Sequence, residues 1–88
     1  MKFKDLNPNY KYEAALITVF ADCGVDPEDD VFAVGDQFMI TSSEMYGAML
    51  AGSFRENGDT ILVDVPISLN GDPFTAVVKD GEWTVFDR

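Results

Sequence analysis

The chain has 88 residues, of which 16 are Asp or Glu, 6 are Lys or Arg and none is His, so its formal net charge is −10. Hydrophobic residues make up 47%, an ordinary share for a folded domain that argues against a disordered chain. Cys23 is the only cysteine. Composition therefore excludes an intrachain disulfide, a cysteine-based zinc site and a triad with an imidazole base.

The length predicts a single domain over residues 1–88. Met1–Asp5 carries positive charge with no apolar run behind it, so it is not expected to be a signal peptide. No segment approaches the roughly 18 apolar residues that would span a bilayer. These features predict a soluble, cytoplasmic protein that does not bind membranes.

A helix is predicted near the start of the chain. Asn7 is a suitable N-cap and Pro8 fits the first helical position, where no amide hydrogen bond is lost. Gly24 can adopt the left-handed conformation that ends a helix. Between them, one apolar stripe recurs at helical spacing: Tyr12, Leu16, Val19, Phe20 and Cys23.

An acidic turn over residues 26–30 separates this helix from a predicted hairpin. The strands of the hairpin are residues 31–34 and 37–40, joined by Gly35-Asp36.

The next segment predicts a short second helix. Thr41 and Glu44 have the spacing of a capping box, and the helix would run to about Leu50. A competing interpretation runs a strand directly from Phe38 into a loop. We favour the helix.

The last third of the chain predicts an antiparallel meander. Asn57-Gly58 favours a type I′ turn between residues 53–56 and 60–68. Asn70–Pro73 makes the next turn, and Asp80-Gly81 joins residues 74–79 to residues 82–87. On one face we expect Ile61, Val63, Val65 and Ile67, and on the other Leu62, Val77 and Phe86, partly covered by one or both helices.

These elements define an α+β fold, with an antiparallel sheet of about four to six strands packed with one long N-terminal helix and one short helix. The closing hairpin, Val77–Val85, is similar to those of many small α+β domains, including nuclear-transport-factor-like ones. Turn chemistry accounts for this similarity, and we assign no family from it.

No catalytic motif emerges. The acids of residues 26–30 could suggest calcium, but an EF-hand loop starting at Asp26 would need glycine at Val31 and glutamate at Gln37. Ser42 and Ser43 have no histidine or nearby lysine as a base. Cys23 is expected to be a buried structural thiol. We therefore expect no enzyme, no metal site and no cofactor.

The distribution of charge is the one functional signal. Between Tyr12 and Phe54 there is no basic residue, whereas acids are interleaved with the apolar pattern. A compact acidic surface repels nucleic acid and attracts basic protein surfaces. The candidate partner-binding residues are Glu13, Asp22, Asp26, Glu28, Asp29, Asp30, Asp36, Glu44 and Tyr46.

The resulting hypothesis is a small acidic binding module or inhibitor that docks on a basic, nucleic-acid-binding surface of a partner protein. In a sharper form its carboxylates mimic nucleic-acid phosphates, as in phage proteins that disarm host defence within the host cytoplasm. The alternative is a non-catalytic assembly protein, for example a homodimer formed through an open edge strand or through Met39, Met45 and Met49. Solubility alone is the simplest explanation of the charge.

Overall fold

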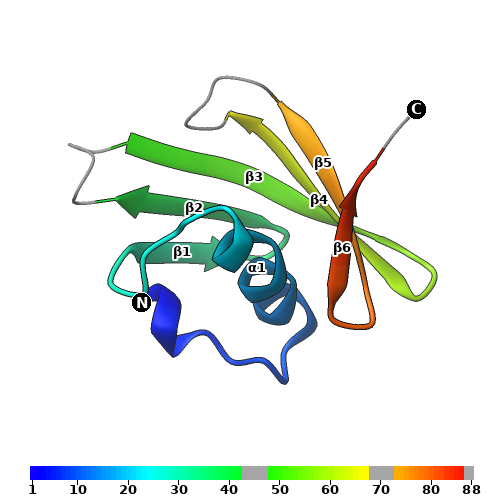
Figure 1. Cartoon of the computed structure of the whole chain (residues 1–88), viewed down its shortest axis with the longest axis horizontal. Coiled ribbons are helices and arrows are strands. Elements are labelled where there is room, and N and C mark those ends of the chain that lie inside the picture. Colours follow the sequence, from blue (N-terminus) through cyan, green and yellow to red (C-terminus); the bar gives the residue numbers. More distant parts are fainter. Residues whose placement is uncertain (43–47, 68–72, 87–88) are drawn as a thin grey trace.

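The computed structural model describes residues 1–42, 48–67 and 73–86. It confirms the α+β class, with six strands in one antiparallel sheet of order β1-β2-β3-β4-β5-β6 (Figure 1). The elements in chain order are a 3₁₀ turn η1 (Phe3–Asp5), α1 (Lys11–Asp22), β1 (Asp30–Val34), β2 (Gln37–Ser42), β3 (Ala48–Asn57), β4 (Thr60–Ile67), β5 (Phe74–Lys79) and β6 (Glu82–Val85).

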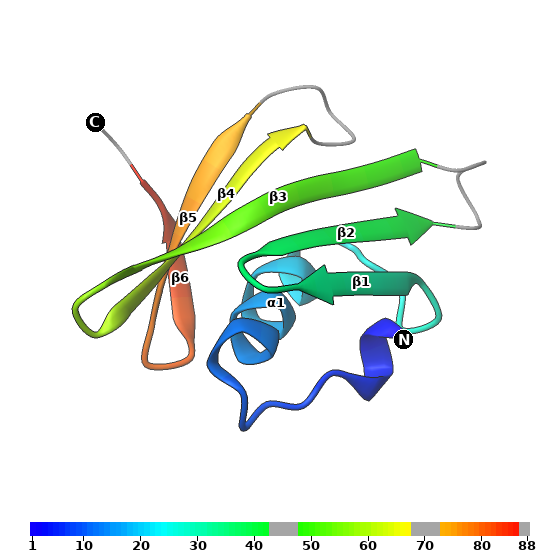
Figure 2. The same ribbon diagram turned by 180° about the vertical axis from the view of Figure 1, so that it is seen from behind.

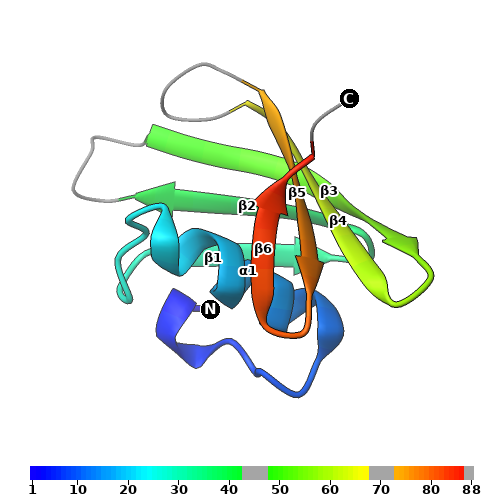
Figure 3. The same ribbon diagram turned by 45° about the vertical axis from the view of Figure 1, so that its right-hand side comes forward.

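The single described α-helix packs on one face of the curled sheet. In Figure 2, β1 and β2 pass in front of α1, and in Figure 3, β6 lies across it. The helix contributes Ala15, Leu16, Val19 and Phe20 to the core, and each of these side chains is buried. They meet the inward side chains of every strand, including Val31, Phe38, Phe54, Val63 and Ala76. Burial of this apolar face is the main force holding helix and sheet together.

The helix begins four residues after the predicted N-cap. Asn7 makes a local turn instead, in which its Oδ1 accepts a hydrogen bond from the Asn9 N–H at 2.9 Å. The N-cap position is Tyr10, which makes no side-chain capping bond. The predicted end is confirmed, because Gly24 has φ +84°. Asn and Pro favour a turn as well as a helix start, and here the turn prevails.

The predicted second helix is wrong where the structure describes this segment. Thr41 and Ser42 belong to β2, whereas Ala48–Leu50 belong to β3, which pairs with β2 through Ile40 opposite Leu50. Residues 43–47, including Glu44 of the proposed capping box, lie outside the described residues. The competing strand interpretation was closer, since Ile40 and Leu50 are both buried in the core. Tertiary burial prevailed over a local capping pattern.

Two of the predicted hairpin turns are confirmed and a third is shifted by one residue, whereas residues 70–72 of the turn predicted at Asn70–Pro73 lie outside the described residues. Val34 pairs with Gln37 across Gly35-Asp36, and Lys79 pairs with Glu82 across Asp80-Gly81. In the third hairpin Asn57 pairs with Thr60, so the central residues are Gly58-Asp59 and not Asn57-Gly58. Gly58 has φ +63°, and Asp59 is not among the described residues with positive φ. This pattern fits a type II′ turn, which needs glycine at the first central position.

The second face of the sheet is not covered by the helix, contrary to the prediction. Leu62 and Val77 pair across β4 and β5 on this face, and Phe86 lies on it next to Thr75, as the alternation predicted. Leu62 is nonetheless only 7% exposed and lies outside the helix-side core cluster. Its cross-strand neighbours on this face are Arg55 and Val77. We call this surface the open face.

Gly52 allows the centre of the core to close. It sits at a register shift in β3, opposite Phe38 of β2. A Cβ placed on Gly52 would overlap the Asp64 backbone carbonyl oxygen and would lie 2.8 Å from the Phe38 ring. Only a residue without a side chain lets β3, β4 and the Phe38 ring approach this closely.

Gly52→Ala is therefore expected to destabilise the fold by more than about 2 kcal/mol, because backbone and a buried ring must both move. Urea unfolding followed by circular dichroism measures the change. The control is Ser53→Ala at the adjacent position of β3, for which we expect a change within about 0.5 kcal/mol. Equal stability of Gly52→Ala and the wild type would contradict the close approach.

Candidate binding surfaces

Four of the predicted site residues shape the connection between α1 and β1. Asp29 is only 5% exposed, and its Oδ2 accepts a hydrogen bond from the Asp26 N–H at 3.0 Å. The Asp26 Oδ1 accepts in turn from the Glu28 N–H at 2.9 Å. These bonds are typical of acidic turns. Asp29 is therefore a structural residue and is not available on the surface.

The N-terminal segment brings lysines to this acidic connection. Lys2 Nζ lies 3.1 Å from Asp30, and Lys4 Nζ lies 2.7 Å from Glu28. The hydrogen bond to Glu28 raises the pKa of Lys4. Within the described residues, no three acids, cysteines or histidines are arranged to hold a metal ion. The acidic connection thus anchors the start of the chain.

Two further predicted residues, Glu13 and Asp22, lie at opposite ends of α1. Glu13 is in the first turn, where its Oε1 accepts a hydrogen bond from the Asn7 N–H at 3.1 Å. Asp22 is in the last turn and accepts from the Trp83 indole N–H of β6 at 2.8 Å. Asp36 is exposed in the β1–β2 turn. Glu44 and Tyr46 lie outside the described residues, and the described members of the predicted set belong to α1, the α1–β1 connection, β1 and the β1–β2 turn.

Every basic side chain in the described part of the chain is already in an ion pair. In addition to the two lysines above, Lys11 pairs with Glu56, Arg55 with Asp64 and Lys79 with Asp59. The described acids without such a pair are Asp5, Glu13, Asp22, Asp26, Asp29, Asp36, Asp80 and Glu82. Seven of these eight, all except the buried Asp29, we call the surplus acids.

Surplus acids flank two hollows of the surface. One, of 490 Å³, lies between the start of α1 and β1, where Glu13 lines it and Asp36 follows the lining residue Gly35. The other, of 410 Å³, lies between the end of α1 and β6, and both Asp22 and Glu82 line it. The two hollows present carboxylates at the two edges of the sheet.

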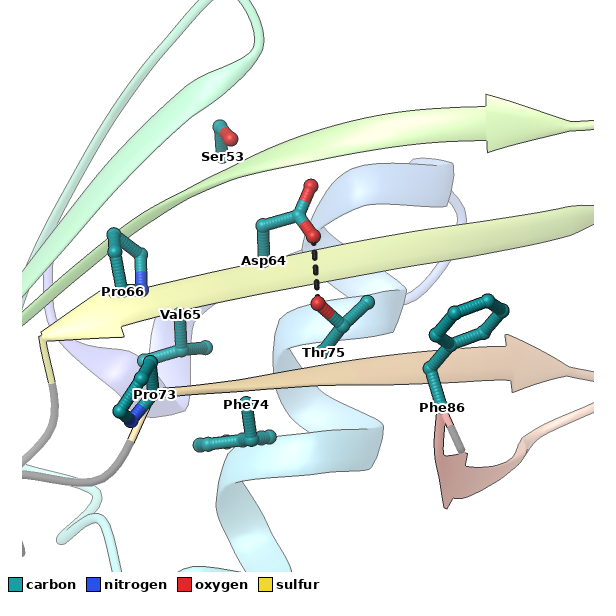
Figure 4. A pocket seen from close by; sticks show the side chains of 8 residues that line it. All are labelled: Ser53, Asp64, Val65, Pro66, Pro73, Phe74, Thr75 and Phe86. Carbon is teal, nitrogen blue, oxygen red and sulfur yellow. Dashed lines mark hydrogen bonds between the residues drawn. The ribbon is translucent and has the colours of Figure 1, made fainter. Parts of the chain in front are cut away.

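A third hollow, of 580 Å³, lies on the open face and combines polar and apolar side chains (Figure 4). Ser53, Asp64 and Thr75 lie in register across β3, β4 and β5. They are flanked by apolar residues: Val65, Pro66, Pro73, Phe74 and Phe86. Sequence reasoning overlooked this site, although alternation in β4 places Asp64 on the face opposite Val63 and Val65.

Asp64 has hydrogen bonds to both carboxylate oxygens. Arg55 Nε donates to Oδ2 at 2.6 Å and Arg55 Nη2 to Oδ1 at 3.0 Å, while the Thr75 hydroxyl donates to Oδ1 at 2.8 Å. The Arg55 hydrogen bonds, with help from Thr75, hold the pKa of Asp64 below its ordinary 3.8. Such a carboxylate is a weak general base, because catalysis of proton transfer near neutral pH needs a raised pKa. The geometry here is that of a structural ion pair.

Cys23 is exposed, which corrects its predicted burial. It follows the last turn of α1 at the C-cap, where the helix leaves the sheet. Partial desolvation of the thiol and the adjacent Asp22 carboxylate raise its pKa. Because the thiolate is the reactive form, these surroundings disfavour nucleophilic chemistry at Cys23.

Comparison with known protein families, curated proteins and solved structures finds no match to this chain. The described residues contain no helix long and apolar enough to cross a membrane.

The Asp64 ion pair predicts an acid-sensitive contribution to stability. Because the pKa of Asp64 is lower in the folded chain than its ordinary 3.8, this contribution is fully present above that pH and is lost as pH falls through the folded pKa. Asp64→Asn should therefore lose less stability than the wild type between about pH 5 and about pH 2. Urea unfolding across this range measures both slopes.

Thr75→Val serves as the graded control, since it removes the smaller of the two side-chain donors. Its acid-side loss should lie between those of the wild type and Asp64→Asn. Identical slopes for the wild type and Asp64→Asn would show that the pair does not distinguish the folded from the unfolded state.

Proposed function

We propose that this chain is a small acidic binding module that docks on a basic surface of a partner protein. The pairing of all five described basic side chains supports this proposal. A partner's lysines and arginines would meet surplus acids with no described cation to compete for them. Such an excess of negative charge opposes folding by self-repulsion. We therefore infer that the charge serves a purpose other than stabilising the fold.

Electrostatic attraction of this kind mainly raises the rate at which the two proteins associate. Opposite surface potentials raise association rates, and the effect falls when salt screens charges beyond about 8–10 Å. Most surplus acids are at least partly exposed, so their attraction for a partner would be strongly salt-sensitive. Buried apolar contacts would then supply the slow dissociation.

In the sharper form of the proposal, the partner binds nucleic acid and the carboxylates take the place of phosphates. DNA carries one charge per about 1.7 Å of its axis, so a mimic needs many acids on one side. The sign of the net charge, −10, supports this form. In this form the chain would act as an inhibitor of the kind that phages use against host defences. DNA would then compete with the chain for the partner.

A second candidate function is a non-catalytic homo-oligomer or assembly protein. The observation that favours it is the exposure of apolar side chains on β1, where Phe32 is 52% and Val34 is 82% exposed. Exposed apolar edge strands are ready to pair with another strand. Light scattering separates the two functions, because only the assembly protein forms a concentration-independent oligomer without a partner.

Affinity capture from lysate, with proteins identified by mass, tests the binding module. Capture should fall at least about tenfold between about 50 mM and about 500 mM salt, because surface charge attraction is screened. Two variants with equal loss of charge identify the surface: Glu13→Gln/Asp36→Asn beside β1, and Asp22→Asn/Glu82→Gln beside β6. At least one of them should weaken capture at low salt.

Capture that resists salt and tolerates both double variants would contradict the proposal. Added duplex DNA tests the mimic form separately. If salt-sensitive capture persists in excess DNA, the mimic form fails and the basic-surface proposal stands.

A further inference from the structure

The outer edge of β1 is only half covered. Across this edge the Val31 N–H donates to the Met1 carbonyl at 2.6 Å, and the Met1 amino group donates to the Val31 carbonyl at 3.0 Å. In an antiparallel sheet, alternate residues direct their backbone groups to the same side. The N–H and C=O of Ala33 therefore point outward too, and within the described residues no backbone group pairs with them.

The uncovered part of the edge carries no charge. Phe32 and Val34 project on the open face and Ala33 projects on the helix side, where it lines the 490 Å³ hollow. Sheet edges are commonly protected by charged side chains or proline, and this tripeptide has neither. The opposite edge, β6, also begins with an acid and continues with the uncharged residues Trp83–Val85. It differs from β1 on the open face: the neighbours of Ala33 there are the exposed apolar Phe32 and Val34, whereas one of the two neighbours of Val85 is Thr84.

The hollow beside Ala33 suits a cationic side chain. Its walls include Glu13, of which only Oε1 accepts a hydrogen bond from a described residue, and Tyr10, which is 62% exposed. Tyr12 lies flat on Phe54, with ring centroids 4.5 Å apart. Lys11 also lines the hollow, and its ammonium is paired with Glu56 and lies 5.6 Å from the centroid of the Tyr12 ring. The second carboxylate oxygen of Glu13 together with the exposed Tyr10 ring provides charge and cation–π attraction for arginine or lysine.

We propose that an extended segment of the partner adds to β1 as a seventh, antiparallel strand, with an arginine or lysine opposite Ala33. In an antiparallel pair the residue that exchanges both hydrogen bonds with Ala33 has its side chain on the same face as Ala33. That side chain enters the hollow toward Glu13 and Tyr10. Its two neighbours lie on the open face beside Phe32 and Val34, so they are apolar. The partner sequence is thus apolar–basic–apolar.

This inference rests on the proposed function and specifies how the partner is held. A second copy of this chain fits less well. Pairing two β1 strands about Ala33 would set Phe32 against Val34, but would place alanine opposite alanine and leave both hollows empty. It would also bring together two chains that each have a net charge of −10. Charge and shape both favour a basic segment.

A capped nonapeptide with central Val-Arg-Val tests the proposal, with a Val-Glu-Val peptide of the same length as comparison. Fluorescence anisotropy should show at least about tenfold tighter binding of the arginine peptide. Hydrogen exchange by NMR should show that the Ala33 amide is unprotected in the free protein and protected when this peptide is bound.

Two edge variants provide a matched pair. Ala33→Pro removes the outward N–H donor of β1, and Val85→Pro removes the corresponding donor of β6, since Val85 also lies on an outer edge with its amide outward. We expect Ala33→Pro to abolish peptide binding and Val85→Pro to leave it unchanged. Glu13→Gln, which keeps an acceptor for the Asn7 N–H, should weaken the arginine peptide about tenfold and reduce its advantage over the glutamate peptide.

Equal binding of the two peptides, or full binding by Ala33→Pro, would overturn the strand-addition proposal. So would a dimer in which the Ala33 amide is already protected without peptide. In the lysate experiment, loss of capture by Asp22→Asn/Glu82→Gln alone would overturn this site while leaving the basic-surface function intact. If capture by the wild type resists salt, the proposed function itself fails.

Discussion

The packing of Phe38 against Gly52 is the contact on which most of the structure depends. The Phe38 ring lies 5.6 Å from Phe20 of α1 and 5.1 Å from Phe54 of β3, measured between ring centroids. Phe54 in turn stacks on Tyr12 in the first turn of the helix. This aromatic chain fixes where α1 begins relative to the β1–β2 turn. The hollow beside β1 follows from it, because Leu16, Tyr12 and Phe54 line that hollow.

Local patterns predicted the hairpins because the chemistry of a two-residue turn is contained within the turn. Gly35-Asp36 and Asp80-Gly81 form where glycine and aspartate allow positive φ. In the third hairpin two adjacent glycine-containing pairs, Asn57-Gly58 and Gly58-Asp59, were both suitable. The observed register of β3 and β4 directs Ile61 and Val63 toward the core, and their burial favours this register. A turn pattern alone does not distinguish such neighbours.

The strand conformation of Thr41–Ser42 and Ala48–Leu50 and the exposure of Cys23 could not be predicted from their neighbours in sequence. Ile40 and Leu50 pair across β2 and β3 and are buried in the core between α1 and the sheet. Their burial favours strands in these two segments. Cys23 fits the apolar stripe, but the helix has left the sheet at its C-cap, so the stripe ends at Phe20. For the candidate sites, sequence reasoning proposed a set of acids and, in the alternative, an unspecified open edge strand. The Arg55–Asp64 pair and the identification of β1 as an open edge require the register of the sheet.

The fold also pairs basic residues with acids that are distant in the sequence. Along the sequence the basic residues lie mostly near the ends, yet Lys2 and Lys4 fold back onto the acidic connection and Lys11 reaches Glu56. Each of these pairs ties a terminal segment or the helix start to the sheet. Exposed ion pairs contribute little stability individually. Their main effect is that each lysine is neutralised by an acid of the same chain. Beside the hollows, the acids without an ion pair are thus Glu13 and Asp36 near β1, and Asp22 and Glu82 near β6. Both places combine acids with outward backbone groups, those of Ala33 on β1 and of Val85 on β6, but only on β1 are both open-face neighbours of that residue, Phe32 and Val34, exposed and apolar. A basic extended segment can therefore satisfy charge, hydrogen bonding and apolar burial together there.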